Sequence, residues 1–146
     1  MPVRSEYHFK EATAAIIAAT GRGLEQAAEK EQENVESQYD SGADALNRAW
    51  TPLAPATIAA KGHDRILYER GDMRNSFYTK RTGPLSVVFG NSSNLLPYHE
   101  YGTEGIPRRP VLTPAKIHLE QEVVRSEIAA EIGKVLAGLR VSGLFR

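Results

Sequence analysis

The chain has 146 residues, eighteen basic and eighteen acidic side chains that give a formal net charge of zero, and no cysteine. This length fits one domain with a modest core, and the lack of cysteine excludes disulfides and thiolate chemistry. A neutral chain has no global positive field for nonspecific binding to nucleic acid or anionic lipid, and no run approaches the roughly eighteen apolar residues of a membrane span. We expect a soluble protein without a secretion signal, suited to a reducing cytoplasm.

A long helix is predicted from about residue 5 to 39, because apolar side chains recur there at steps of three and four. Ser41-Gly42 predicts its end. Gly21 and Gly23 each weaken a helix by about 1 kcal/mol relative to alanine, so we expect a kink or a break there. The second half of this helix is acidic, which indicates either a solvated face or a stripe that meets a partner or lines a channel for DNA.

Short elements follow the long helix. Residues 43–50 indicate another helical turn or two, and Pro55 suits the first turn of a short helix that ends near Gly62. Residues 71–76 predict a turn that leads into an extended segment.

Two β-rich runs, 77–82 and 86–90, are separated by the turn residues Gly83-Pro84. This arrangement predicts an antiparallel hairpin. A polar loop comes next, and residues 95–101 are expected to form a short ordered segment.

The last predicted element is a helix over residues 113–138, with Thr113 as its cap and Pro114 at its first helical position. Val111-Leu112 is expected to return toward the sheet, and residues 139–146 are read as a tail. The chain therefore predicts one α+β domain spanning 1–146: a long N-terminal helix within 1–40, a core over 50–112 with a small antiparallel sheet, and a C-terminal helix packed on the sheet.

The segment from Tyr98 to Leu112 combines aromatic residues with turn and extended signals. Gly102 permits a positive φ, while Pro107 and Pro110 fix their own φ and extend the residues before them. We interpret it as an ordered, exposed loop that presents side chains to a partner.

No catalytic, cofactor or metal site is predicted. The four histidines are scattered, without the spacing of a compact zinc site. His99 and Glu100 suggest an acid and a base, but adjacent side chains point apart on a strand or a helix and rarely meet at one substrate atom. The pair Gly21 and Gly23 lacks the strand and further residues of a phosphate-binding loop.

Positive charge concentrates between residues 61 and 81. We consider three interpretations: these side chains are simply solvated, they contact acidic groups of a neighbouring subunit, or they contact DNA phosphate. With the acidic first helix they suggest self-complementary subunits arranged head to tail in a closed ring.

The order of several short motifs resembles the tailed-phage virion-morphogenesis or tail-completion family. The resemblance spans about residues 50 to 112 and rests on the combination of these motifs: Trp50-Thr51-Pro52-Leu53, Thr57, Lys61, Ile66-Leu67, Arg70 to Phe77, Val87 to Gly90, Tyr98 to Gly102, and Arg109 to Leu112. Flanking long helices also suit this family.

The resemblance implies a non-enzymatic virion protein of the neck or upper tail, assembled in the host cytoplasm. It implies a ring, expected to be sixfold, that contacts adjacent neck or connector and tail-tube proteins, with phage DNA passing through the lumen without sequence-specific binding. A tail terminator or head-closure ring is the related alternative. Alternatives of another class are a small hydrolase or nuclease that uses His99 and Glu100, and a DNA-binding module that uses the basic middle of the chain.

Two groups of residues are assigned roles within the matched segment. Tyrosine and arginine are favoured at interfaces, so Tyr98, Tyr101, Arg108 and Arg109 are candidate subunit contacts, with Arg109 expected to pair with a carboxylate or main-chain carbonyls of a neighbour. The tyrosines could equally pack within the loop or core. The second group is expected to anchor the fold: Trp50, Leu53, Gly71, Gly90, Gly102 and Pro110.

Overall fold

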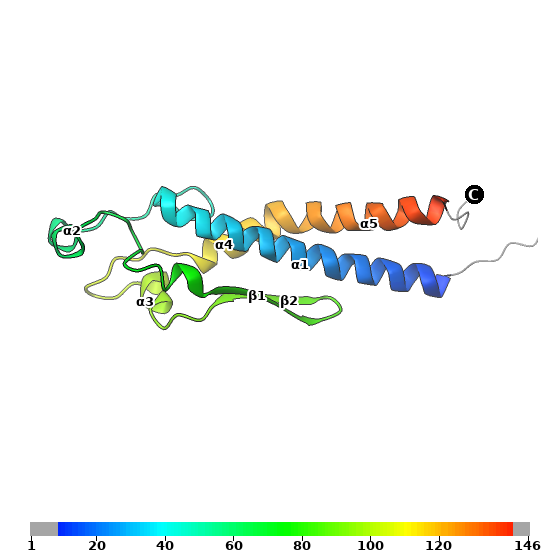
Figure 1. The fold of residues 1–146 in the computed structure, drawn as a ribbon, viewed down its shortest axis with the longest axis horizontal. Helices are drawn as coiled ribbons and strands as arrows, with labels where there is room; N and C mark the ends of the chain where they lie inside the picture. Colours follow the sequence, from blue (N-terminus) through cyan, green and yellow to red (C-terminus); the bar gives the residue numbers. More distant parts are fainter. Residues whose placement is uncertain (1–8, 142–146) are drawn as a thin grey trace, which may run out of the picture.

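The computed structural model describes residues 9–141, and its elements form an elongated α+β body. The long helix α1 lies beside α5, the two run in opposite directions, and the hairpin lies along α1 (Figure 1). The predicted fold class is therefore confirmed. In chain order the elements are α1 (Phe9–Ser41), α2 (Pro55–Lys61), the 3₁₀ turn η1 (Arg74–Ser76), β1 (Phe77–Gly83), β2 (Ser86–Asn91), α3 (Leu96–Tyr101), α4 (Leu112–His118), the π turn η2 (Leu119–Val123) and α5 (Val124–Val141).

The helix α1 continues without interruption through Gly21 and Gly23, so the expected kink or break is wrong. Both glycines lie where another segment approaches the helix closely. A Cβ atom on Gly21 would lie 2.2 Å from the carbonyl oxygen of Pro84 in the hairpin turn, and one on Gly23 would lie 2.7 Å from the Cα of Ile128 in α5. Because glycine has no side chain, Gly21 lets the hairpin turn pack against the α1 backbone, and Gly23 does the same for α5.

The strands β1 and β2 pair antiparallel, from Phe77 opposite Asn91 to Gly83 opposite Ser86, which confirms the predicted hairpin. Gly90 lies opposite Tyr78, and a Cβ atom there would come within 2.9 Å of the Tyr78 hydroxyl oxygen. The tyrosine ring thus occupies the space that a side chain at position 90 would need. This contact explains why a glycine stands in the middle of a strand.

The core gathers where α1 ends. Tyr39 packs edge-to-face against Trp50, with ring centroids 5.7 Å apart, and against Phe77 at 6.1 Å. Trp50 is 4% exposed and its indole Nε1 donates to the carbonyl oxygen of Pro110 at 3.0 Å. Trp50 therefore joins its segment to the core and to Pro110 of the 98–112 segment.

Residues 43–50 form a closed turn and not the expected helical turns. The Asp44 carboxylate accepts the backbone N–H groups of Leu46 and Arg48, at 2.9 and 3.0 Å. Asn47 has a positive φ of 58°, and Ala43 pairs with Ala49 in an isolated bridge. A short aspartate side chain that bonds nearby backbone N–H groups competes with helix formation, which gives the physical reason for the difference.

The C-terminal helical segment differs from the single predicted helix in three ways. It begins at Leu112, so Val111 and Leu112 do not extend the sheet; the π turn divides it; and α5 continues to Val141. Its later part packs on α1, where Glu131, 3% exposed, receives hydrogen bonds from Lys134 and from Arg22 at 2.9 Å. These bonds lower the pKa of Glu131 to about 2, with Lys134 contributing most. Positions 5–8 of the expected first helix and 142–146 of the expected tail lie outside the described residues.

Candidate interaction site

The short helix α3 has one buried face and one exposed face. Leu96 and Glu100 point inward and are 3% and 5% exposed. Leu95, Tyr98 and Tyr101 are 58%, 53% and 77% exposed. These three residues are spaced by three positions, so they share one side of the helical turn. We call them the α3 surface; it places two of the predicted interface residues, Tyr98 and Tyr101, side by side on the outside of the protein.

Glu100 fixes α3 to the start of α4. Its carboxylate accepts the backbone N–H groups of Val111, Leu112 and Thr113 at 2.7, 2.9 and 2.8 Å. These are donors that a helix leaves unpaired at its N-terminus. The sequence predicts Thr113 as the cap of this helix, but the Glu100 carboxylate of α3 takes that role. Val111, the residue before α4, makes no capping hydrogen bond with its side chain.

Hydrogen bonding determines the charge state of this buried carboxylate. Burial alone would raise the pKa of Glu100, but bonds from the Thr113 side chain and from the backbone N–H groups of Val111, Thr113 and Leu112 outweigh burial and hold the pKa below its ordinary value. Glu100 is thus an ionised structural group at neutral pH.

Arg109 makes the paired hydrogen bonds expected of it, but within its own chain. Its Nε donates to the carbonyl oxygen of Thr51 at 2.7 Å and its Nη2 to that of Pro52 at 3.0 Å. Its backbone N–H donates to the carbonyl oxygen of His99 at 2.7 Å, and the residue is 5% exposed. Arg109 holds the loop against residues 51–52, and its guanidinium is not free for the neighbour that the sequence suggested.

The chain between α3 and α4 is held as a fixed loop. Gly102 ends α3 with φ of 74°, and a Cβ atom there would lie 3.1 Å from the backbone nitrogen of Arg108. Thr103 and Ile106 exchange backbone hydrogen bonds of 2.9 and 3.2 Å. The side chain of Arg108 is exposed overall, with its Nε donating to the carbonyl oxygen of Glu100 at 3.0 Å. Gly102 thus lies at the point where the chain leaves α3 and packs closely against residue 108.

A cavity of about 670 Å³ lies behind this loop, between α2 and residues 67–73. Leu53 and Gly71, both predicted anchors, line it together with Lys61 and Arg109. Gly71 adopts a φ of 89°, which favours glycine. His99 also lines the cavity; burial, and then the charges of Arg109 and Lys61, lower its pKa.

His99 and Glu100 do not form a shared acid–base site. The Glu100 carboxylate is occupied by three N–H donors of α4, while the buried Nδ1 of His99 has no hydrogen-bond partner. Glu100 thus contacts the start of α4, whereas His99 lines the cavity.

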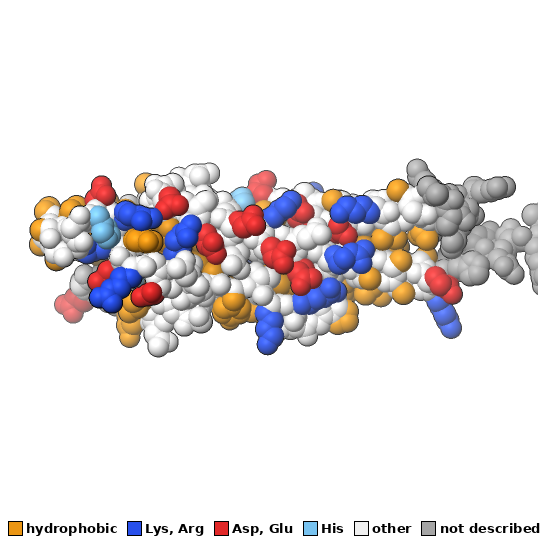
Figure 2. Space-filling model, viewed as in Figure 1, with side chains coloured by type: hydrophobic (Ala, Val, Ile, Leu, Met, Phe, Trp, Pro, Cys, Tyr) orange, Lys and Arg blue, Asp and Glu red, His pale blue; other side chains and the backbone are white. Residues whose placement is uncertain are grey.

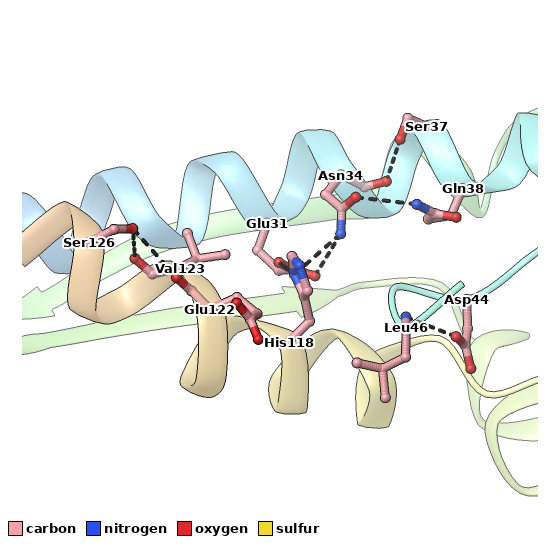
Figure 3. A network of polar contacts seen from close by, with 10 residues as sticks. All are labelled: Glu31, Asn34, Ser37, Gln38, Asp44, Leu46, His118, Glu122, Val123 and Ser126. Atoms are coloured by element: carbon pink, nitrogen blue, oxygen red, sulfur yellow. Dashed lines mark hydrogen bonds and ion pairs between the residues drawn. The ribbon is translucent and has the colours of Figure 1, made fainter. Parts of the chain in front are cut away.

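A second cluster of polar side chains joins α1 to the end of α4 (Figure 3). The Glu31 carboxylate, which is fully buried, lies 2.5 Å from the Nδ1 of His118, and the Asn34 amide donates to Glu31 at 3.2 Å. Burial raises the pKa of Glu31 despite the bonds from His118 and Asn34. Sequence reasoning missed this contact, because nothing in the spacing pairs two residues 87 positions apart.

Basic residues from the middle of the chain pair with acidic residues of α1. Arg65 and Arg74 both approach Asp40, at 2.7 and 3.9 Å, and Arg81 approaches Glu25 at 3.6 Å. On the face drawn in Figure 2, acidic and basic side chains are interleaved along the body. Part of the charge complementarity predicted between subunits is therefore satisfied inside one chain.

Within residues 9–141 no group of three or more histidine, aspartate or glutamate side chains is placed to hold a metal ion. None of the described helices has the length and apolar character needed to cross a bilayer. Compared with known proteins, the chain matches no family model, no curated protein and no solved structure.

Proposed function

We propose that this chain is a structural protein of the head–tail connection of a tailed phage, acting in the neck or in tail completion. It assembles as a sixfold ring beside connector and tail-tube proteins, and DNA passes through the lumen without sequence-specific binding. The symmetry and the neighbours come from the resemblance of residues 50–112 to tail-completion proteins.

The observation that carries this proposal is the α3 surface. Leu95, Tyr98 and Tyr101 are large, apolar or aromatic and exposed, and side chains of this kind are favoured at protein interfaces. They stand on a rigid base, because Glu100 and Arg109 on the inner side are fully engaged in hydrogen bonds. A preorganised surface loses little conformational entropy when it binds a neighbour.

The motifs that carry the resemblance also meet in space. Trp50 donates to Pro110, and Arg109 donates to Thr51 and Pro52, so the first and last matched motifs are bonded directly to each other. Their shared purpose in this chain is to position the loop and the α3 surface. This arrangement supports a scaffold for contacts with neighbouring proteins.

A genetic complementation experiment tests the proposal. Deleting the gene from the phage that encodes this chain should leave heads and tails unjoined, and the wild-type gene should restore infectious particles. The double variant Tyr98→Ala and Tyr101→Ala should fail to restore them, whereas Lys80→Ala, an exposed change on β1, should succeed. Infectious, joined particles made without the gene would contradict the proposal.

Tail terminator and head-closure rings differ from this proposal in the neighbours they contact. The alternatives of another class make separate predictions: a hydrolase or nuclease would lose turnover in His99→Ala, and a DNA-binding module would bind duplex DNA in a strongly salt-dependent manner. The ion pairs of Arg65, Arg74 and Arg81 with α1 reduce the positive charge that the second of these would use.

A further inference from the structure

An apolar groove lies apart from the α3 surface, between α1, the hairpin and the start of the C-terminal helical segment. Its volume is about 510 Å³, and its apolar walls include Leu24 of α1, Leu85 and Phe89 of the hairpin, and Leu119 and Val124 after α4. Leu85 is 52% exposed, so apolar area remains open to solvent. We call this the hairpin groove.

The size and chemistry of the hairpin groove fit aromatic side chains. Pockets of about 300–1,000 Å³ hold compact organic groups, and apolar walls favour rings over charged groups. The α3 surface offers two tyrosines and a leucine that are exposed on one side of a helical turn. One chain thus carries a projecting aromatic surface and an apolar recess at different places.

One charged side chain beside each surface has the opposite sign: Glu104 in the loop after α3 and Lys116 in the groove. The same loop also carries the exposed Arg108. Lys116 is the one charged residue among those that line the groove in the described part of the chain. Its contact with Glu120 is 3.9 Å long and both side chains are largely exposed, so this pair holds the ammonium group weakly. Glu104, which follows α3 in the loop, is exposed, and within residues 9–141 it takes part in none of the ion pairs.

We propose that the α3 surface of one copy docks into the hairpin groove of a second copy, with Tyr98 and Tyr101 against the apolar walls and Glu104 beside Lys116. The bonds of Glu100 and Arg109 hold α3 in place, and no α3 residue lines the hairpin groove of its own chain. A contact between two different surfaces of identical chains repeats from copy to copy and closes into a ring when the rotation permits. The ring closure rests on the proposed function; the pairwise contact does not.

Cysteine cross-linking tests the contact, because the chain contains no cysteine of its own. Tyr101→Cys and Leu85→Cys, each made separately, are mixed at high concentration and oxidised. Docking brings the two thiols together, so we expect roughly tenfold or more cross-linked dimer than in a matched mixture of Tyr101→Cys with Ala130→Cys, an exposed position on α5. Equal yields in the two mixtures would overturn the inference.

Charge reversal gives an independent test that keeps the aromatic residues. Glu104→Lys and Lys116→Glu should each weaken self-association roughly fivefold, because each places like charges together. The two changes combined in one chain should restore association to within about twofold of wild type. Sedimentation measures association, and circular dichroism checks that each variant is folded. A double variant as weak as the product of the two single effects, or a wild-type chain with no self-association, would overturn the inference.

The outcomes separate this inference from the proposed function. If the chain forms a ring in the particle neck but the Tyr101 and Leu85 thiols do not cross-link above control, the docking inference alone fails. If they cross-link while the chain is absent from tailed particles, the proposed function fails and the contact stands.

Discussion

Glu100 shows how a single buried carboxylate can organise an exposed surface. It accepts three backbone N–H groups at the start of α4 while its neighbours Tyr98 and Tyr101 face outward. We predict that Glu100→Gln lowers the free energy of unfolding by about 1–3 kcal/mol, because an amide cannot accept all three bonds and places its own donors near N–H groups. Urea denaturation followed by the fluorescence of Trp50, the single tryptophan, measures this change.

The matched control is Glu104→Gln on the exposed loop, which should change the free energy of unfolding by no more than about 0.5 kcal/mol. Equal effects of the two substitutions would show that the carboxylate of Glu100 does not stabilise the start of α4.

The same residue predicts a dependence of stability on pH. The pKa of Glu100 in the folded protein lies below its ordinary value of 4.5, so the folded state binds the proton less readily than the unfolded chain. Its contribution is complete above the ordinary pKa and is lost as the pH falls through the folded pKa. The difference in unfolding free energy between wild type and Glu100→Gln should therefore shrink as the pH falls below about 4.5. A difference that is constant with pH would contradict this assignment.

At the scale of elements, two glycines with different surroundings predict opposite responses to alanine. Gly23→Ala should lower the free energy of unfolding by about 1–3 kcal/mol, because its Cβ would meet the backbone of α5 at Ile128. Gly133→Ala on α5 should raise it by up to about 1 kcal/mol, because nothing lies within 4 Å of the new methyl group. Urea denaturation measures whether each substitution raises or lowers the free energy of unfolding. If both substitutions raised it, α1 and α5 would not be closely packed at Gly23.

The order of elements could be predicted where the signal is local. The hairpin follows from β-rich runs around Gly83-Pro84, and α2 begins at Pro55 as expected. The errors arise where a distant partner decides the outcome. Gly21 and Gly23 are read as helix breakers in isolation, but they are contact positions in the fold.

In the candidate site, too, local features could be predicted from the sequence and long-range contacts could not. Tyr98 and Tyr101 could be predicted as presented side chains from their place in a turn-rich segment, and they are exposed. That Arg109 is buried against Thr51 and Pro52 could not, because the contact joins residues more than fifty positions apart. The hairpin groove likewise combines α1, the hairpin and the C-terminal helical segment.

At the scale of the whole molecule, the fold is a long body built on α1, whose 33 residues span about 50 Å at 1.5 Å per residue. Figure 1 places α2 and α3 toward one end of the body. The beginning of α1 and the end of α5 lie at the other end. The α3 surface is therefore presented near one end of the body.

The most direct test of this account is a cryo-electron microscopy map of the tailed particle encoded together with this chain. We predict a sixfold ring of copies between head and tail, with Tyr98 and Tyr101 buried at the boundary between adjacent copies. A particle whose head–tail connection contains no copy of this chain would contradict the central claim.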